Sequence, residues 1–390
     1  MQWGWFPMEA PLIGRRVRGS IEAIHETGCL QQMTDLANGD ELESEDDLKT
    51  LKSLRDDFRR VQEQIGRVVI GQEDVIHELF VTLLGDGHAL LVGVPGLAKT
   101  LLIRTLAQSL EMSFKRIQFT PDLMPADVTG TDVIFENQTG GEREFRFLPG
   151  PVFAHVVLAD EVNRTPPKTQ ASLLEAMQEN QVTVGGSVHS LPSPFFVLAT
   201  QNPIEQEGTY PLPEAQLDRF MLQIMIGYPS ETEELEIALT TTSTRPEPVE
   251  SVIGVDAMLA YQDLVRRLPV SHAVGEYAVR LARATRPDSS SPLDTVKRYV
   301  RWGAGPRASQ HLILAAKARA ALKGQNQVRP EDIASVARSV LRHRVRLNFA
   351  ADADGIETDR FIDEMISSTP VEGNGATRGA DQLFRSENTR

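Results

Sequence analysis

The feature that most constrains the fold of this chain is the loop GVPGLAKT, residues 93–100. It closely follows the phosphate-binding pattern G-x-x-x-x-G-K-[ST], which lies between a strand and a helix. The apolar run HALLVG precedes the loop, and a helical pattern runs from Lys99 to about Leu110. Glycines let backbone N–H groups turn toward phosphate oxygens, and the helix presents the positive end of its dipole to the same anion. The loop therefore predicts a nucleotide-binding turn. The alternative is a tight strand–helix turn with a surface lysine.

Ala98 departs from the general pattern, which has glycine just before the lysine. Alanine costs about 1 kcal/mol if this position needs a positive φ, because its Cβ is then crowded. Alanine is slightly better than glycine if the position is helical. The sequence leaves both conformations of Ala98 open. The other characteristic residues of the loop, Gly93, Gly96, Lys99 and Thr100, are all present.

Short apolar runs alternate with helical patterns over the first part of the chain. We expect strands at HALLVG, FKRIQF, HVVLADE, PFFVLATQN and MLQIMI, and helices at 48–65, 99–110 and 169–180. This alternation is typical of an α/β fold in which helices cover both faces of a parallel sheet. Two further segments, 131–148 and 181–191, alternate around glycine-containing turns and predict β-hairpins.

Strand patterns disappear from about Glu231 onward. Helical patterns follow at 255–268, 272–286, 293–301, 306–323 and 330–343, and Pro246 and Pro248 mark a flexible point near the boundary. The predicted domains are a disordered N-terminal extension at 1–47, a core with two hairpins at 48–230, an all-helical lid at 231–346 and a C-terminal helix and tail, largely disordered, at 347–390.

The charge and the cysteine content of the chain indicate which kinds of partner and which cellular compartment to expect. The chain has 390 residues and a formal net charge of −14, which counts against broad binding to the phosphate backbone of nucleic acids. The single cysteine, Cys29, allows no internal disulfide and fits a reducing compartment. No apolar run is long enough to cross a bilayer, and the N-terminus lacks the pattern of an export signal. We therefore expect a cytoplasmic protein, translated from either Met1 or Met33.

Polar side chains end two of the predicted strands. Asp160 and Glu161 close VVLADE, at the end of a strand where ligands bind in open α/β sheets. Asp160 can hold Mg²⁺ through water, and Glu161 can orient and deprotonate an attacking water. Asn202 follows PFFVLAT, so its amide should lie beside these carboxylates if the strands are neighbours. Each signal alone is more often an ordinary strand end or turn, but after GVPGLAKT they together indicate nucleotide hydrolysis.

The ordered series GVPGLAKT, VVLADE, ATQNP, LPEAQLDRF and GAGPRA resembles the AAA+ ATPases, and specifically the MoxR family. The stretch DEVNRTPPKTQASLLEAMQENQVTV is especially similar to that family, and the likeness covers about residues 50–345. MoxR-type loops often carry alanine or glycine before the lysine, so Ala98 falls within the family's range. The resemblance implies a parallel-sheet AAA+ P-loop ATPase core followed by an all-α helical lid domain, with ATP or ADP and Mg²⁺ as ligands.

The resemblance also implies roles for individual positions. The nucleotide-binding positions are Val69, Ile70 and Gly71 against the adenine, and Gly93, Val94, Pro95, Gly96, Leu97, Ala98, Lys99, Thr100 and Leu101 around the phosphates. Lys99 would neutralise the β- and γ-phosphates, while Thr100 and Asp160 would hold Mg²⁺. The catalytic positions are Asp160, Glu161, Asn202, Arg219 and Arg307.

The resemblance also implies roles for three arginines, which bear on how subunits assemble. Arg219 in EAQLDRF resembles the arginine finger that reaches a neighbouring subunit's ATP, with a surface salt bridge as the alternative. Arg307 in GPRAS resembles the second sensor, which contacts the γ-phosphate from the helical domain, and Arg164 is a further candidate for the subunit interface. A site that needs its neighbour's arginine is completed only in a ring or spiral. The family expectation is a homohexamer.

The implied function is an ATP-driven, chaperone-like motor that assembles, activates or metallates a client protein. A partner with a von Willebrand factor A domain is common in the family, and the hairpins would project toward the ring's pore or one face. The alternatives are the motor subunit of a magnesium-chelatase-like complex and a DNA-dependent AAA+ motor. The likeness around DEVNRTPPKTQ favours MoxR over the chelatase, and the acidic charge balance counts against DNA.

Overall fold

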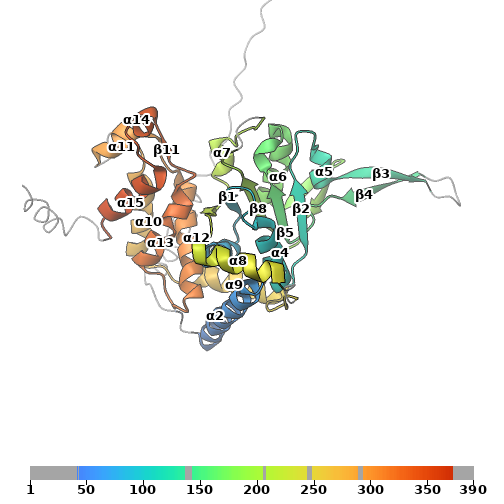
Figure 1. Cartoon of the computed structure of the whole chain (residues 1–390), viewed down its shortest axis with the longest axis horizontal. Coiled ribbons are helices and arrows are strands. Elements are labelled where there is room, and N and C mark those ends of the chain that lie inside the picture. Colours follow the sequence, from blue (N-terminus) through green and yellow to red (C-terminus); the bar gives the residue numbers. More distant parts are fainter. Residues whose placement is uncertain are drawn as a thin grey trace, which may run out of the picture.

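The computed structural model describes residues 42, 44–136, 143–204, 208–243, 248–288 and 293–371. They form an α/β unit around a central sheet and a helical unit that packs beside it (Figure 1). Residues 1–41 of the predicted extension and the tail from residue 372 lie outside the described residues. No helix within the described ranges is long and apolar enough to cross a membrane.

The central sheet has five strands in the order β2-β5-β8-β1-β9, and every neighbouring pair is parallel. Its strands are β1 (Ala89–Val92), β2 (Phe114–Gln118), β5 (Val156–Asp160), β8 (Phe196–Gln201) and β9 (Leu222–Met225). Because the strands run the same way, the residues that follow β1, β5 and β8 meet at one edge of the sheet. All the predicted strands are present, and the predicted α/β fold is confirmed.

The sheet is covered on both faces, so its strands are apolar at nearly every position. Alternate residues of β1 belong to different apolar clusters, with Ala89 and Leu91 in one and Leu90 and Val92 in the other. Helices α3 (Glu73–Leu84) and α4 (Lys99–Ser109) pack in the first cluster, and α6 (Pro167–Glu179) packs in the second.

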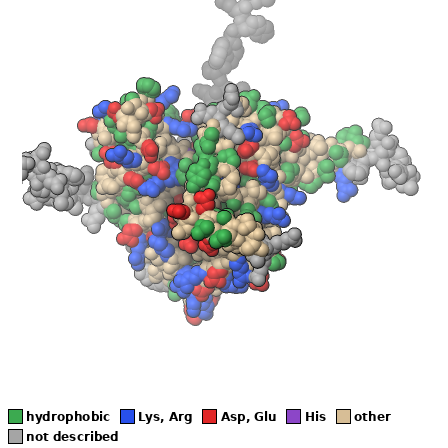
Figure 2. All heavy atoms as spheres, viewed as in Figure 1, with side chains coloured by type: hydrophobic (Ala, Val, Ile, Leu, Met, Phe, Trp, Pro, Cys, Tyr) green, Lys and Arg blue, Asp and Glu red, His purple; other side chains and the backbone are tan. Residues whose placement is uncertain are grey.

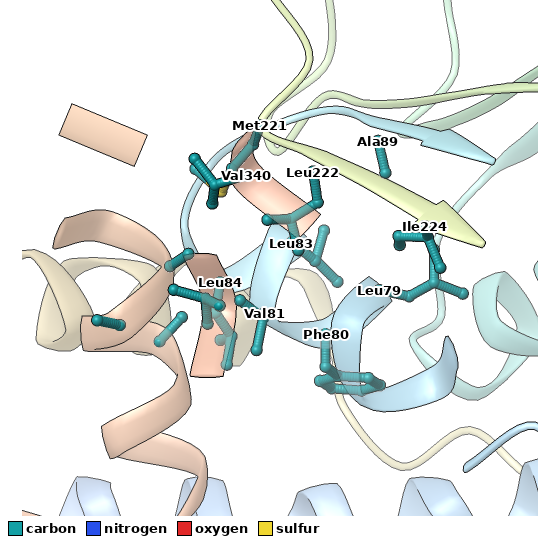
Figure 3. Packing of buried hydrophobic residues seen from close by; sticks show 14 of the residues in the cluster. Leu79, Phe80, Val81, Leu83, Leu84, Ala89, Met221, Leu222, Ile224 and Val340 are labelled. Carbon is teal, nitrogen blue, oxygen red and sulfur yellow. The ribbon is translucent and has the colours of Figure 1, made fainter. Parts of the chain in front are cut away.

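The α/β unit and the helical unit share one continuous core. Figure 3 shows Leu79 and Leu83 of α3 close to Ile224 of β9, with Val340 of the helical unit in the same cluster. Helix α2 (Glu45–Gly66) adds Leu54, which is fully buried, to this cluster. The shared core fixes the helical unit against the sheet.

Helix α2 begins earlier than the sequence pattern predicts. The structure starts it at Glu45, so residues 45–47 belong to the helix and not to the predicted extension. These residues are Glu45, Asp46 and Asp47, and carboxylates in a first turn are stabilised by the positive end of the helix dipole. Apolar periodicity cannot find them, because none of them faces the core.

Both predicted hairpins are present. Strands β3 (Gly130–Glu136) and β4 (Arg143–Pro149) pair antiparallel after the short helix α5 (Pro125–Thr129), and their hairpin projects away from the body (Figure 1). Its predicted turn, NQTGG, lies outside the described residues. Strands β6 (Gln181–Val184) and β7 (Ser187–Ser190) form the second hairpin, and both glycines of its turn have positive φ.

The helical unit contains the four longer helices that the sequence predicts. They are α9 (Val255–Arg267), α10 (His272–Ala284), α12 (Pro306–Leu322) and α13 (Pro330–Leu341). Alanines at 315, 316, 318, 320 and 321 are all buried in α12 and let its neighbours approach closely. Pro246 of the predicted boundary lies outside the described residues.

Two predictions for the helical unit are wrong. The predicted helix at 293–301 ends early, as α11 (Asp294–Tyr299), and continues as strand β10 (Val300–Trp302). Strand β10 pairs antiparallel with β11 (Arg346–Leu347), so strands do not disappear after Glu231. A β-branched and an aromatic residue at the ends of β10 favour the extended backbone over the helix.

The helical unit begins at residue 231, where the sequence predicts it, but it extends further than predicted at its C-terminal end. Helix α8 (Glu231–Ser243) has no buried residue, so it lacks the apolar face that would reveal it in the sequence. Helices α14 (Phe349–Ala353) and α15 (Thr358–Ser368) follow residue 346. The predicted C-terminal helix after residue 346 is therefore present, and Phe361 of α15 is fully buried. The further prediction that this segment is largely disordered is wrong over 347–371.

Candidate nucleotide-binding site

The loop GVPGLAKT connects β1 to α4, as its pattern predicts. The ammonium of Lys99 donates to the carbonyl oxygen of Gly93 at 2.6 Å, which holds the lysine across the loop. A Cβ on Gly93 would lie 2.7 Å from the carbonyl oxygen of Ile226, so no larger residue fits there. Ala98 has φ 54° and ψ 21°, the left-handed conformation. Of the two conformations that the sequence leaves open, the structure therefore shows the strained one.

A cavity of about 420 Å³ lies against this loop at the edge of the sheet. Its lining residues are Pro95, Gly96, Ala98, Lys99, Thr100, Leu101, Asp160, Glu161, Thr200 and Asn202. The structure thus brings together the loop, both carboxylates and the amide that the sequence places there. Gly93, Val94 and Leu97 belong to the same loop without lining the cavity.

The two carboxylates are held by a threonine that sequence reasoning missed. The hydroxyl of Thr200 donates to Asp160 Oδ1 at 2.6 Å and accepts from the backbone N–H of Glu161 at 2.8 Å. Thr200 ends the apolar run PFFVLAT on β8, next to β5. A polar residue closing such a run could have flagged it. The cavity also perturbs Lys99, since burial lowers its pKa while Asp160 and Glu161 act in the opposite direction.

Asn202 presents an unused donor to the cavity. Its Oδ1 accepts from the backbone N–H of Ile204 at 3.1 Å, which fixes the amide. Its Nδ2 is buried, and no described residue accepts a hydrogen bond from it. A buried donor without a partner is costly. A phosphate oxygen or a water in the cavity would satisfy it, so the residues present fit a nucleotide.

Strand β2 adds two polar residues that sequence reasoning also missed. Arg116 donates to Asp160 Oδ2 through Nε at 3.0 Å and through Nη2 at 2.6 Å. Gln118 donates to Glu161 Oε2 at 2.8 Å and accepts from Arg116. Arg164, the candidate interface residue, lies 3.2 Å from the same Glu161 oxygen. The alternation of Arg116, Ile117 and Gln118 in FKRIQF is the signal that could have identified a polar face.

Val69, Ile70 and Gly71 line a separate cavity of about 470 Å³. Glu236 of α8 also lines it, so the helix that the sequence did not reveal covers the expected adenine position. Next to Gly71, the side chain of Gln72 donates to the carbonyl of Leu97 at 3.2 Å, which ties this segment to the phosphate loop.

Arg219 and Arg307 lie near each other, and neither of them lines the Lys99 cavity. Arg307, at the start of α12, pairs with Asp218 at 3.1 Å. Burial lowers the pKa of Arg219, and the charge of Arg307 acts in the same direction. Arg344 pairs with the other Asp218 oxygen at 2.8 Å. The structure therefore groups Arg307 with Arg219 and Arg344 around Asp218.

Comparison with known proteins matches the two units separately. Residues 88–222 match the model of the ATPase family associated with various cellular activities (AAA), and residues 294–365 match the AAA lid domain. A solved structure from Cytophaga hutchinsonii, described as a candidate ATPase, superposes with a TM-score of 0.77 at 41% identity, over 83% of this chain and 97% of that one.

Similar proteins also cover most of the chain. Chaperone MoxR1 of Mycobacterium tuberculosis is 44% identical over 308 residues, which span 79% of this chain and 80% of the relative. Protein MoxR of Paracoccus denitrificans is 31% identical over 310 residues, 75% of this chain and 89% of the relative. With the loop, the strand-end carboxylates and the lid all in place, the chain belongs to the MoxR family of AAA+ ATPases.

Proposed function

We propose that this protein hydrolyses ATP with Mg²⁺ and uses the cycle as a chaperone-like remodelling motor on a client protein. The observation that carries the proposal is the cavity that Lys99, Asp160, Glu161 and Asn202 share. Phosphoryl transfer to water needs a cation at the phosphates, a base for the water and a donor beside both. The cavity supplies all of them.

Each residue then has a defined task. Lys99 neutralises phosphate charge, and Thr100 and Asp160 are the metal-binding positions. Bound Mg²⁺ would supply charge neutralisation on the phosphates. Glu161 accepts the proton of the attacking water, and Asn202 Nδ2 donates to that water or to a phosphate oxygen. Val69, Ile70 and Gly71 would contact the adenine.

Arg219 and Arg307 lie outside the cavity, which supports a role toward the ATP of a neighbouring subunit. We extend the proposal to a homo-oligomeric ring, a hexamer by family expectation, in which both arginines complete the next subunit's site. Arg164 stays a prediction for that interface, and it contacts Glu161 of its own chain.

A protein client is supported by the name of the mycobacterial relative, a chaperone. The β3–β4 hairpin is a candidate contact, because Ile134 and Phe145 expose most of their side chains on it. On the face drawn in Figure 2, acidic and basic side chains are interspersed and form no basic stripe, which counts against the DNA-dependent motor. Metallation of the client, the von Willebrand factor A partner, the chelatase-like alternative and a cytoplasmic location stay predictions.

The test of the chemistry is Glu161→Gln, which keeps the shape of the side chain and removes the base. We expect ATP binding to persist while the hydrolysis rate falls roughly 10²- to 10⁴-fold. Glu175→Gln is the matched control, since Glu175 is exposed on α6. Normal turnover by Glu161→Gln would contradict the assignment. Stimulation of turnover by DNA, and not by a von Willebrand factor A protein, would favour the DNA motor.

A further inference from the structure

Arg116 contacts the proposed metal-binding carboxylate, and the proposed chemistry gives this contact no task. Its guanidinium donates twice to Asp160 Oδ2, at 3.0 and 2.6 Å, and Thr200 donates to Oδ1 at 2.6 Å. Both oxygens of the proposed metal-binding carboxylate therefore already accept hydrogen bonds from protein donors. Gln118 accepts from the same guanidinium, which fixes its orientation on β2.

The charges at this point argue that the contact is more than structural. A charge-assisted pair with two N–H donors on one oxygen is among the stronger hydrogen-bonded arrangements. A divalent cation drawn to Asp160 meets a positive guanidinium 2.6 Å from one carboxylate oxygen, and like charges at such distances repel. The guanidinium and a metal ion would thus both bind the Asp160 carboxylate, while their positive charges repel each other.

The burial of the two partners differs in a way that lets the pair open. The side chain of Asp160 is 14% exposed, while that of Arg116 is 46% exposed. The arginine can therefore move into solvent on its flexible stem, whereas the carboxylate stays at the end of β5. Lys115, the adjacent residue on β2, is exposed and alternates to the other side of the strand, so it does not share the contact.

We infer that Arg116 competes with Mg²⁺ for Asp160, and so sets the Mg²⁺ concentration that the site needs. The inference rests on the proposed function, because it takes Asp160 as a metal-binding residue. Arg116 is a positioning residue in this scheme. It holds Asp160 by an ion pair, and metal binding requires that pair to open.

The experiment measures the affinity of the full chain for ADP while free Mg²⁺ is titrated, so no turnover is involved. Arg116→Ala should lower the half-saturating Mg²⁺ concentration roughly two- to fivefold, the range that a part-exposed ion pair supports. Arg116→Lys keeps the charge and should stay nearer the wild-type value. Lys115→Ala is the matched control and should leave the Mg²⁺ dependence unchanged.

A second measurement separates the metal from the nucleotide. With a chelator in place of Mg²⁺, the ADP affinity of Arg116→Ala should equal that of the wild type. If Arg116→Ala changed the ADP affinity equally with and without Mg²⁺, Arg116 would affect nucleotide binding and not metal binding. That result would overturn the inference. An unchanged or higher Mg²⁺ requirement in Arg116→Ala would overturn it too.

The outcomes also distinguish this inference from the proposed function. If the wild type binds ADP and Lys99→Ala does not, the site assignment stands, whatever Arg116→Ala does. If the wild type fails to bind ADP at saturating Mg²⁺, the proposed function fails and the inference falls with it. Thermal unfolding of each variant without nucleotide checks that Arg116→Ala and Lys115→Ala are equally folded.

Discussion

Ala98 shows how one residue of the phosphate loop stores strain. Its φ of 54° puts the Cβ in the crowded left-handed region, where glycine carries no such penalty. We predict that Ala98→Gly leaves the free energy of unfolding unchanged or raises it by about 1 kcal/mol, since relief of strain offsets the greater flexibility of glycine when unfolded. Chemical denaturation checks this.

The matched control for Ala98→Gly is Ala171→Gly, at an exposed position inside helix α6. Glycine there should lower the free energy of unfolding by about 1 kcal/mol, because the backbone is helical. Equal losses in the two variants would contradict the left-handed conformation of Ala98.

At the residue scale, the sequence identified the side chains that follow individual strands. Lys99, Asp160 and Asn202 could be placed because each stands beside a recognisable strand or loop. Arg116 and Thr200 could not, because their role depends on which strands are neighbours and in what register. That pairing is a property of the folded sheet, and no local pattern encodes it.

At the element scale, helix α15 tests whether the helical unit continues past residue 346. Phe361 is 1% exposed, and it packs in the core cluster that also contains α13. We predict that Phe361→Ala lowers the free energy of unfolding by about 3–5 kcal/mol, the loss typical of a buried aromatic ring. Phe349→Ala is the control, because Phe349 is 84% exposed and its loss should stay within about 0.5 kcal/mol. Similar small losses in both variants, measured by chemical denaturation, would mean that α15 is not part of the core.

The elements that the sequence missed share a physical reason. Periodicity reveals a helix only through a buried face, and α8 buries none of its residues. Strand β10 is three residues long and is extended because β11 pairs with it, from a segment far along the chain. The longer strands and helices were predictable because each buries an apolar face of its own.

At the scale of the whole molecule, the boundary between the two units contains a half-buried histidine, His77. His77 of α3 faces the helical unit, and burial lowers its pKa to about 4, with the positive charges of Arg319 and Lys323 acting in the same direction and Asp74 opposing them. An unfolded histidine titrates near 6.5, so between these values the unfolded chain binds more protons than the folded chain. Stability is therefore lost as the pH falls from about 6.5 toward 4.

We predict that the titration of His77 alone lowers the free energy of unfolding by about 2 kcal/mol when the pH falls from 7.5 to 5.0. His77→Gln should remove that part of the pH dependence, whereas His272→Gln, at an exposed position, should not. Comparing the two variants cancels the other titrating groups, including Glu78, whose pKa is raised by burial. Denaturation at the two pH values measures the difference, and identical pH dependence in both variants would contradict the lowered pKa of His77.

The assembly is tested by mixing variants whose defects lie on different sides of a subunit interface. Lys99→Ala removes a residue that lines the cavity, while Arg219→Ala removes one that lies outside it. If Arg219 completes the neighbouring site, each variant alone is inactive, and a 1:1 mixture regains about a quarter of wild-type ATPase activity by random assortment around a ring. Mixing Lys99→Ala with Glu161→Gln is the control. Both residues line the same cavity, so every site lacks one of them and no activity returns. Recovery in the control, or none with Arg219→Ala at any ratio, would contradict a trans role for the arginine.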